Sequence, residues 1–347
     1  MLISQRTCLN NNMLRHALET VASTTRASHV SISPIVARDL SIFRSLFESR
    51  TMTAAHAAVL HFGGSREAAK KRLQKLKAAG FIRERRNAVT QPACLFLTRK
   101  GMDVLKTEGI LAEYPKLDPV SLDRRSRVGD LTLRHELQVM DVKTAVHASV
   151  AKDSSLTIAE FTTWPLLNEF EAQRHSGAEV LVRPDGFMRL HEKEGEALFE
   201  HAFFLELDRS TETIDSLVFR AGAYLNHYKS GTFAERHGAT RDEFRDFPFR
   251  VLMVFKSAER RNNTAHRLVA HLPSILTLVW LTTIDEVKAD PLGPIWIRPL
   301  DYREATKGSR FSTDRQPTSW GYRRDVEREF HVDRRVKKLR LLGDEVR

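Results

Sequence analysis

Three acidic residues in the middle of the chain have the types and spacing needed for metal chemistry. Asp185 lies in the segment RPDG (183–186), at the turn between two predicted strands, and Glu206 and Asp208 alternate with apolar residues in HAFFLELD (201–208). Because residues two apart on a strand project from the same face, Glu206 and Asp208 could both point toward Asp185. Carboxylates at strand ends can hold Mg²⁺, which could activate water and stabilise charge on a phosphodiester.

A fourth acid, Glu136, lies on a helix predicted over 131–148 and could reach the same place. The residues also leave a purely structural interpretation open. Asp185-Gly186 is an ordinary hairpin turn sequence. Glu206 and Asp208 could instead pair with basic neighbours in a structural network, the candidates being Arg183, Arg209 and Arg220.

Apolar patterns predict the elements that position these carboxylates. The predicted helices cover 131–148, 213–228 and 264–271, and the predicted strands cover 156–159, 180–183, 186–190, 202–207, 249–255, 277–281 and 295–297. Strands with helices on both sides of the run indicate a mixed-sheet α/β (α+β) domain, here over residues 129–300. The polar residues 113–128 are interpreted as a linker, 301–347 as a basic C-terminal tail, and 1–32 as an N-terminal tail.

Basic residues with a helical pattern lie nearer the N-terminus. Helices are predicted over 34–50, 53–61 and 65–79, with Gly63-Gly64 breaking the second helix and Gly80 ending the third. Two apolar segments, 81–82 and 94–97, enclose the basic, polar stretch 83–91, which is typical of a β-hairpin. This order of elements predicts a winged helix-turn-helix domain over residues 33–112.

Charge indicates the partner of this domain. Between residues 65 and 106, twelve basic residues stand against three acidic ones, a net charge of +9 out of +11 for the chain. A short basic helix that follows a glycine turn suits insertion into the major groove of double-stranded DNA. The predicted DNA contacts are Arg66, Lys70, Lys71, Gln74 and Lys77 on the helix and Arg83, Arg85 and Arg86 on the hairpin. The alternative is a solvated basic face or a winged helix that binds only protein.

Lys70 and Lys77 offer the simplest test of that prediction. Their replacement by Ala is predicted to abolish tight duplex binding.

Composition excludes several other classes. The two cysteines, Cys8 and Cys94, form neither a disulfide framework nor a zinc motif. The longest mostly apolar run, 275–281, is too short to span a bilayer, and residues 1–26 lack the apolar stretch of a secretory signal. We therefore expect a cytoplasmic protein without a membrane partner.

The order of these segments resembles the replication-relaxation proteins of plasmids and integrative elements. The resemblance runs from about Ser33 to Ile297 and includes four short motifs, which are RHELQVMDVKTAV (134–146), VRPDGFM (182–188), HAFFLELDRSTET (201–213) and RAGAYLNHY (220–228). It implies a PD-(D/E)xK nuclease-like domain, with Pro184-Asp185 as its first motif and Glu206 in its second. Glu136 would then be the helical acid of such a fold.

One position departs from that motif, because Asp208 stands where a lysine is expected. In some relatives of the fold the lysine has moved to the next helix, where this chain offers Arg220 and Lys229. Arginine stabilises phosphate but is a poor proton shuttle, since it stays charged. A degenerate domain that binds DNA or partners is therefore as consistent with the motif as an active nuclease.

Three functional classes follow. The favoured one is a DNA-binding protein of a mobile genetic element that acts in replication, relaxation or transfer control. The others are a Mg²⁺-dependent nickase or endonuclease and a winged-helix transcriptional regulator, a class that commonly binds palindromic sites as a homodimer. A helical tyrosine pair, Tyr224 and Tyr228, is interpreted as core packing and not as a relaxase nucleophile.

Overall fold

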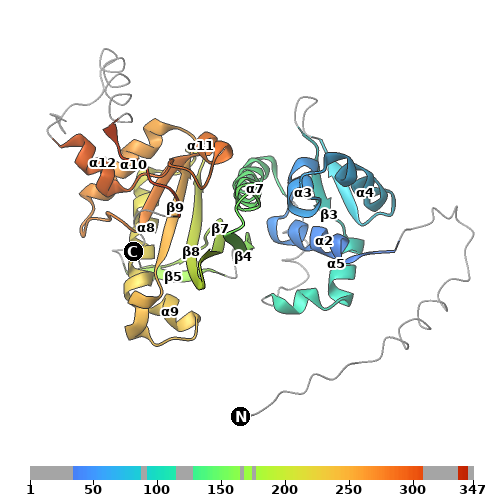
Figure 1. The fold of residues 1–347 in the computed structure, drawn as a ribbon, viewed down its shortest axis with the longest axis horizontal. Helices are drawn as coiled ribbons and strands as arrows, with labels where there is room; N and C mark the ends of the chain where they lie inside the picture. The colour runs from blue at the N-terminus through green and yellow to red at the C-terminus, as the bar shows by residue number, and fades with distance from the viewer. Residues whose placement is uncertain are drawn as a thin grey trace, which may run out of the picture. The chain divides into compact units, whose positions relative to one another are not determined.

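The computed structural model describes residues 34–86, 92–114, 128–164, 168–173, 177–307 and 335–342. From Ile35 onward they belong to one compact unit of mixed α/β structure. The predicted N-terminal tail and most of the predicted linker lie outside the described residues. Figure 1 shows the helices and strands, coloured from blue at the N-terminus to red at the C-terminus.

The N-terminal elements comprise helices and a small antiparallel sheet. The helices are α2 (Ala37–Ser49), α3 (Ala54–His61), α4 (Arg66–Ala78) and α5 (Arg99–Thr107), followed by the 3₁₀ turn η1 (Ile110–Glu113). The strands β1 (Met52–Thr53), β2 (Ile82–Arg85) and β3 (Cys94–Leu97) form a sheet in the order β1-β3-β2. The helices α2, α3 and α4 and the strand β3 lie where the sequence predicts them. β2 extends to Arg85, into the stretch expected to be polar hairpin loop, and residues 87–91 of that loop lie outside the described residues. β1 is too short for a pattern.

Local sequence explains the boundaries of these elements. Thr53 and Ser65 begin α3 and α4 by accepting hydrogen bonds from backbone N–H groups of the first turn. Between the helices, Gly63 and Gly64 have φ angles of +57° and +87°, a region that favours glycine. Ile42 of α2 and Leu73 of α4 are buried in the shared core, so the opposite face of α4 is left toward solvent.

A five-stranded mixed sheet forms the centre of the rest of the described chain. Its strands are β4 (Leu156–Thr162), β7 (Gly186–Glu194), β8 (Ala197–Asp208), β9 (Phe249–Phe255) and β10 (Val279–Thr283). Their order is β10-β9-β8-β7-β4. The β4–β7 and β7–β8 pairs are antiparallel, whereas β8–β9 and β9–β10 are parallel. A separate two-stranded ribbon pairs β5 (Phe170–Gln173) with β6 (Glu179–Val182).

Helices cover both faces of this sheet. They are α7 (Asp130–Val150), α8 (Ile214–Lys229), α9 (Thr232–Arg236), α10 (Ala258–Ala270), α11 (Ile284–Ala289) and α12 (Pro299–Thr306), with the 3₁₀ turn η3 (Arg241–Asp246). Neighbouring residues of β8 enter different cores, because side chains alternate along a strand. Phe204 packs with residues of α8 and α10, and Leu205 packs with residues of α7.

Helix α7 also contacts the N-terminal elements. Arg50, just after α2, ion-pairs with Glu136 at 3.0 Å, and His56 Nε2 of α3 lies 2.8 Å from Asp141 Oδ1. The buried Lys143 Nζ donates to the carbonyl oxygen of Phe161 at 2.6 Å and lies 3.8 Å from Glu48 of α2. Polar contacts of α7 are therefore one link between the N-terminal elements and the large sheet. The stacking of Trp164, just after β4, on Phe47 of α2 is another.

Of the expected C-terminal tail, residues 301–307 and 335–342 are described and are folded; the rest of it lies outside the described residues. The chain after residue 300 continues α12, and the last described segment returns to the large sheet, where Leu339 pairs with Trp296. Val336, Leu339 and Leu341 are buried there. The basic residues around them favoured a tail, but burial of these three apolar side chains and the pairing of Leu339 with Trp296 stabilise the segment against the core.

No helix in the described ranges is long and apolar enough to cross a membrane.

Candidate functional site

A pocket of about 790 Å³ opens at the ends of β7 and β8, between α7 and α8. Asp185 comes just before β7, and Glu206 and Asp208 end β8. All three carboxylates line this pocket, together with His135 of α7 and Arg220 of α8. The structure thus brings four of the sequence-predicted residues together: Asp185, Glu206, Asp208 and Arg220.

Asp185, just before β7, forms hydrogen bonds with both β8 and α7. Its Oδ2 accepts a hydrogen bond from the backbone N–H of Leu207 at 2.7 Å, and its Oδ1 lies 2.8 Å from His135 Nε2. Burial alone would lower the pKa of His135, but the hydrogen bond and charge of Asp185 outweigh it, so this pKa is raised. The protonated imidazole is thereby favoured beside the carboxylate.

Glu206 is almost fully buried and is paired on both oxygens. The hydroxyl of Tyr224 donates to Oε1 at 2.7 Å, and the guanidinium of Arg220 donates to Oε2. Burial raises the pKa of Glu206 despite the opposing charge of Arg220. Tyr224 is therefore a core residue whose hydroxyl binds one carboxylate of the pocket, that of Glu206.

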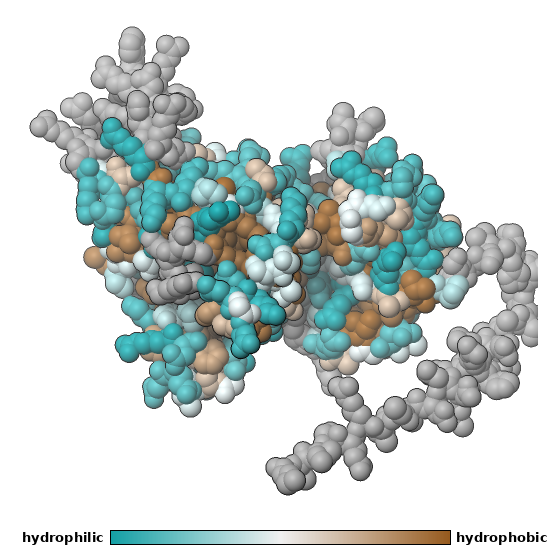
Figure 2. Space-filling model, in the orientation of Figure 1, coloured by the Kyte–Doolittle hydropathy of each residue, from teal (hydrophilic) through white to brown (hydrophobic). Residues whose placement is uncertain are grey.

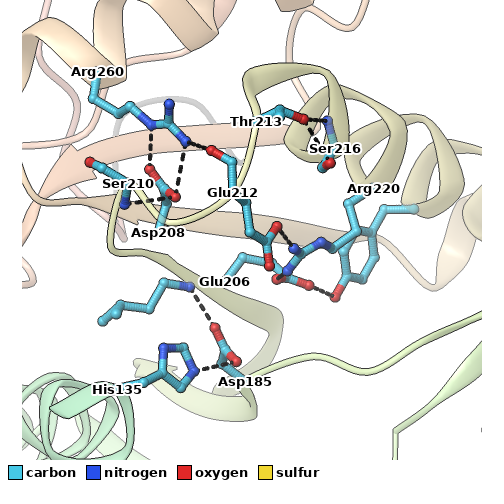
Figure 3. A network of polar contacts seen from close by, with 12 residues as sticks. His135, Asp185, Glu206, Asp208, Ser210, Glu212, Thr213, Ser216, Arg220 and Arg260 are labelled. Atoms are coloured by element: carbon cyan, nitrogen blue, oxygen red, sulfur yellow. Dashed lines mark hydrogen bonds and ion pairs between the residues drawn. The ribbon is translucent and has the colours of Figure 1, made fainter. Parts of the chain in front are cut away.

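Asp208 turns toward a different arginine. Nε of Arg260, at the start of α10, donates to Oδ2 at 2.7 Å, and Nη2 donates to Oδ1 at 3.2 Å, a two-point contact visible in Figure 3. The backbone N–H of Ser210 adds a third hydrogen bond at 3.1 Å. Asp208 and Glu206 leave the same strand but have separate cationic partners.

These contacts test whether the carboxylates fit a magnesium ion. Both oxygens of Asp185, Glu206 and Asp208 already meet donors of the protein. In the described part of the chain, no group of three His, Cys, Asp or Glu side chains is placed to hold a metal. Since a metal needs oxygen lone pairs directed at it, the observed arrangement does not fit Mg²⁺.

The position of α7 differs from the sequence-based expectation for Glu136. This side chain pairs with Arg50 and does not line the pocket, whereas its neighbour His135 does. Successive helical residues point about 100° apart, so a small error in the helix phase exchanges the two. Lys229, the other candidate for the displaced lysine, lies exposed at the end of α8 and does not line the pocket.

Helix α4 presents a second candidate site. Arg66, Lys70, Lys71 and Gln74 are exposed, and none of the three cations has an acidic partner among the residues that the structure describes. Lys77 is only partly exposed and ion-pairs with Glu84 of β2. Hydrophilic residues dominate the surface in the region of α4 (Figure 2).

The three arginines of the hairpin differ in their surroundings. The guanidinium of Arg83 lies 5.0 Å from the ring centroid of Phe96, and that of Arg85 lies 5.3 Å from it. Arg85 also donates to the carbonyl oxygen of Val128 at 3.2 Å and is half-buried. Arg83 and Arg86 are exposed, so they are the better placed of the three to meet a ligand.

The described chain therefore combines a mixed-sheet domain, which has a pocket of paired carboxylates and arginines at its strand ends, with a helical region that bears an exposed basic helix. A family model described as replication-relaxation matches residues 43–242, which span both of these parts. The match covers more than half of the 347 residues, and the chain belongs to the replication-relaxation family. No curated protein and no solved structure shows significant similarity to it.

Proposed function

We propose that this protein binds double-stranded DNA of a mobile genetic element and acts in its replication, relaxation or transfer control. The observation that carries the proposal is the exposed face of α4 that bears Arg66, Lys70 and Lys71, three cations without an acidic partner among the described residues. Membership of the replication-relaxation family supports the same role.

The DNA-binding region would be a winged helix-turn-helix. Three helices with a three-stranded sheet in the order β1-β3-β2 support this interpretation. In such a domain α4 enters the major groove, where Gln74 can read a base edge. Arg66, Lys70 and Lys71 on the helix, with Arg83 and Arg86 on the hairpin, would contact phosphates.

Three other basic residues of this region have structural partners. Lys77 pairs with Glu84, Arg85 bonds to Val128, and Arg72 pairs with the buried Asp39. Their loss would alter the fold as well as the charge. Lys70 and Lys71 are therefore better positions for a substitution test than Lys70 and Lys77, because Lys71 is exposed and Lys77 is paired.

A fluorescence-anisotropy titration of a labelled duplex tests the proposal. We expect the double substitution Lys70→Ala, Lys71→Ala to weaken duplex binding by roughly tenfold or more, because two phosphate contacts are lost. The matched control is Lys152→Ala, Lys193→Ala, which removes the same charge from exposed positions far along the sequence. Equal affinity of the two double variants would exclude α4 as the DNA contact.

The mixed-sheet domain would be a degenerate relative of PD-(D/E)xK nucleases. Helix α7, the antiparallel strands β4, β7 and β8, helix α8 and the parallel strand β9 follow one another in an order that supports this interpretation. The protein donors on all three pocket carboxylates argue against a metal-dependent nickase. We therefore propose a domain that contributes to binding and does not cut DNA.

A supercoiled-plasmid assay with Mg²⁺ or Mn²⁺ separates these two roles. We expect intact supercoils together with a gel shift, both for the native protein and for Asp185→Ala. Nicked circles produced by the native protein alone would instead establish the nickase.

A further inference from the structure

Two arginines contact both the end of β8 and the short loop 209–213 that follows it. Arg220 donates to the carboxylates of Glu206 and Glu212, and Arg260 donates to Asp208 and to the carbonyl oxygen of Glu212. Figure 3 shows both guanidinium groups reaching the same loop from different helices. The loop includes Ser210, a non-glycine residue with a φ angle of +63°.

The burial of the carboxylates explains why such partners are needed. The side chains of Glu206 and Asp208 are 2% and 3% exposed, and those of Arg220 and Arg260 are 22% and 18% exposed. A buried carboxylate without a counter-charge is costly, so it is paired or coordinates a metal. The guanidinium groups supply the charge that a divalent cation would otherwise supply.

The two pairs differ in their relation to Asp185. Both carboxylate oxygens of Asp208 accept hydrogen bonds from Arg260. Glu206, by contrast, is next in the chain to Leu207, whose backbone N–H donates to Oδ2 of Asp185 at 2.7 Å, and both carboxylates line the pocket. The pair that could share one cation inside the pocket is therefore Asp185 and Glu206, and the cation present there is Arg220.

We propose that Arg220 is a built-in cation that occupies the place of a divalent metal beside Asp185 and Glu206, so that the pocket takes up no Mg²⁺ or Mn²⁺. Removing its charge frees Oε2 of Glu206, and the oxygens of Asp185 keep lone pairs that His135 and Leu207 do not use. The two carboxylates can then coordinate a divalent ion that retains several of its waters. This inference rests on the pocket alone and does not depend on DNA binding by α4.

Electron paramagnetic resonance of free Mn²⁺, titrated with the full-length protein, tests the inference without a DNA substrate. We expect no saturable binding by the native protein or by Arg220→Lys, which keeps the charge. Arg220→Gln should bind one Mn²⁺, with affinity in roughly the millimolar range of weak oxygen sites. Asp185→Asn added to Arg220→Gln should abolish that binding.

Arg298→Met is the matched control. Arg298 forms a similarly buried pair with Asp301, at 2.8 Å, outside the pocket. This variant should remain without saturable Mn²⁺ binding, because it frees only one carboxylate. Circular dichroism establishes that each variant is folded.

Two results would overturn the inference. One is a native protein that binds a single Mn²⁺ ion and loses it on Asp185→Asn, since the metal would then enter despite Arg220. This comparison needs no arginine variant and holds even if Arg220→Gln does not fold. The other is a folded Arg220→Gln protein that binds Mn²⁺ no better than the native protein does.

Discussion

Lys70 and Arg72 lie two positions apart on α4 and meet different surroundings. Lys70 is exposed, whereas Nε of Arg72 donates at 2.8 Å to Oδ1 of Asp39, a carboxylate with no exposed surface. The backbone N–H of Val36 donates to the other oxygen of Asp39 at 2.9 Å, at the start of α2. Arg72 therefore holds α4 against α2, while Lys70 is available to a ligand.

This difference predicts opposite effects of two substitutions on stability. Arg72→Ala should lower the free energy of unfolding by about 3 kcal/mol, because it leaves a buried carboxylate without its cation. Lys70→Ala should change that free energy by less than about 0.5 kcal/mol, as expected for an exposed position. Urea denaturation followed by circular dichroism measures both. Similar values for the two variants would contradict the structural role of Arg72.

Gly101 occupies a position where even one methyl group has no room. A Cβ there would lie 2.5 Å from the carbonyl oxygen of Phe81 and 2.5 Å from Cδ1 of Leu97. Gly101→Ala should therefore destabilise the base of the hairpin by about 1–3 kcal/mol, the usual cost of overpacking.

Gly129→Ala is the control for that substitution, since a Cβ at Gly129 meets nothing within 4 Å. The two variants are compared by thermal unfolding. An unchanged midpoint for Gly101→Ala would show that α5 can move away from the hairpin.

At the scale of elements, two histidines lie where α3 approaches α7. Burial lowers the pKa of His61 and of His147 from 6.5 to about 4, and the positive charge of Lys143 adds to the effect. The Nε2 atoms of both are buried and have no hydrogen-bond partner within the described ranges. Protonation of either ring therefore favours the unfolded chain.

The resulting pH dependence has a defined sign. Between about pH 6.5 and pH 4 the unfolded chain binds more protons at these sites, so stability is full above pH 6.5 and falls as pH decreases. We expect His147→Leu to reduce the loss of unfolding free energy between pH 7.5 and pH 5 by about 1–2 kcal/mol. Urea titrations at the two pH values measure it, and an unchanged loss would show that His147 is not protonated on unfolding.

Elements with strong local patterns could be predicted from the sequence, and those held by distant contacts could not. The apolar run of β9 gave its bounds, Phe249–Phe255, and two glycines placed the start of α4. The two residues of β1 carry no alternation, and the segment 335–342 returns to the core from far along the chain. The few apolar residues of this segment do not indicate that it pairs with Trp296.

The candidate site was predictable to a similar extent. Alternation along β8 brought Glu206 and Asp208 into one pocket with Asp185. Arg260, however, reaches Asp208 from 52 residues away, and no spacing rule connects them. His135 was missed because a 21-residue helix with apolar residues on several sides does not define which neighbour faces the sheet.

At the scale of the whole molecule, most of the net charge belongs to one short region. Residues 65–106 carry +9 of the chain's +11. Binding of DNA through this region releases counterions, so affinity should fall steeply as salt increases.

The dependence of DNA affinity on salt concentration tests whether this region contacts phosphates. The slope of log affinity against log salt concentration should be shallower by about 2 in Lys70→Ala, Lys71→Ala, since each phosphate contact contributes roughly 0.9. Anisotropy titrations at several salt concentrations measure it. Parallel lines for the native protein and this variant would mean that the two lysines do not contact phosphates.

Helix α7 constrains the number of its residues as well as their identity. Within it, His135 faces the pocket and Glu136, Asp141 and Lys143 face partners near the N-terminal helices. One residue inserted between Glu136 and Asp141 would turn the two ends by about 100° and part them by about 1.5 Å. Either the contacts before the insertion or those after it would then be lost. The number of residues in this stretch is thus constrained independently of their chemistry, and the helix should tolerate substitution there far better than any change of length.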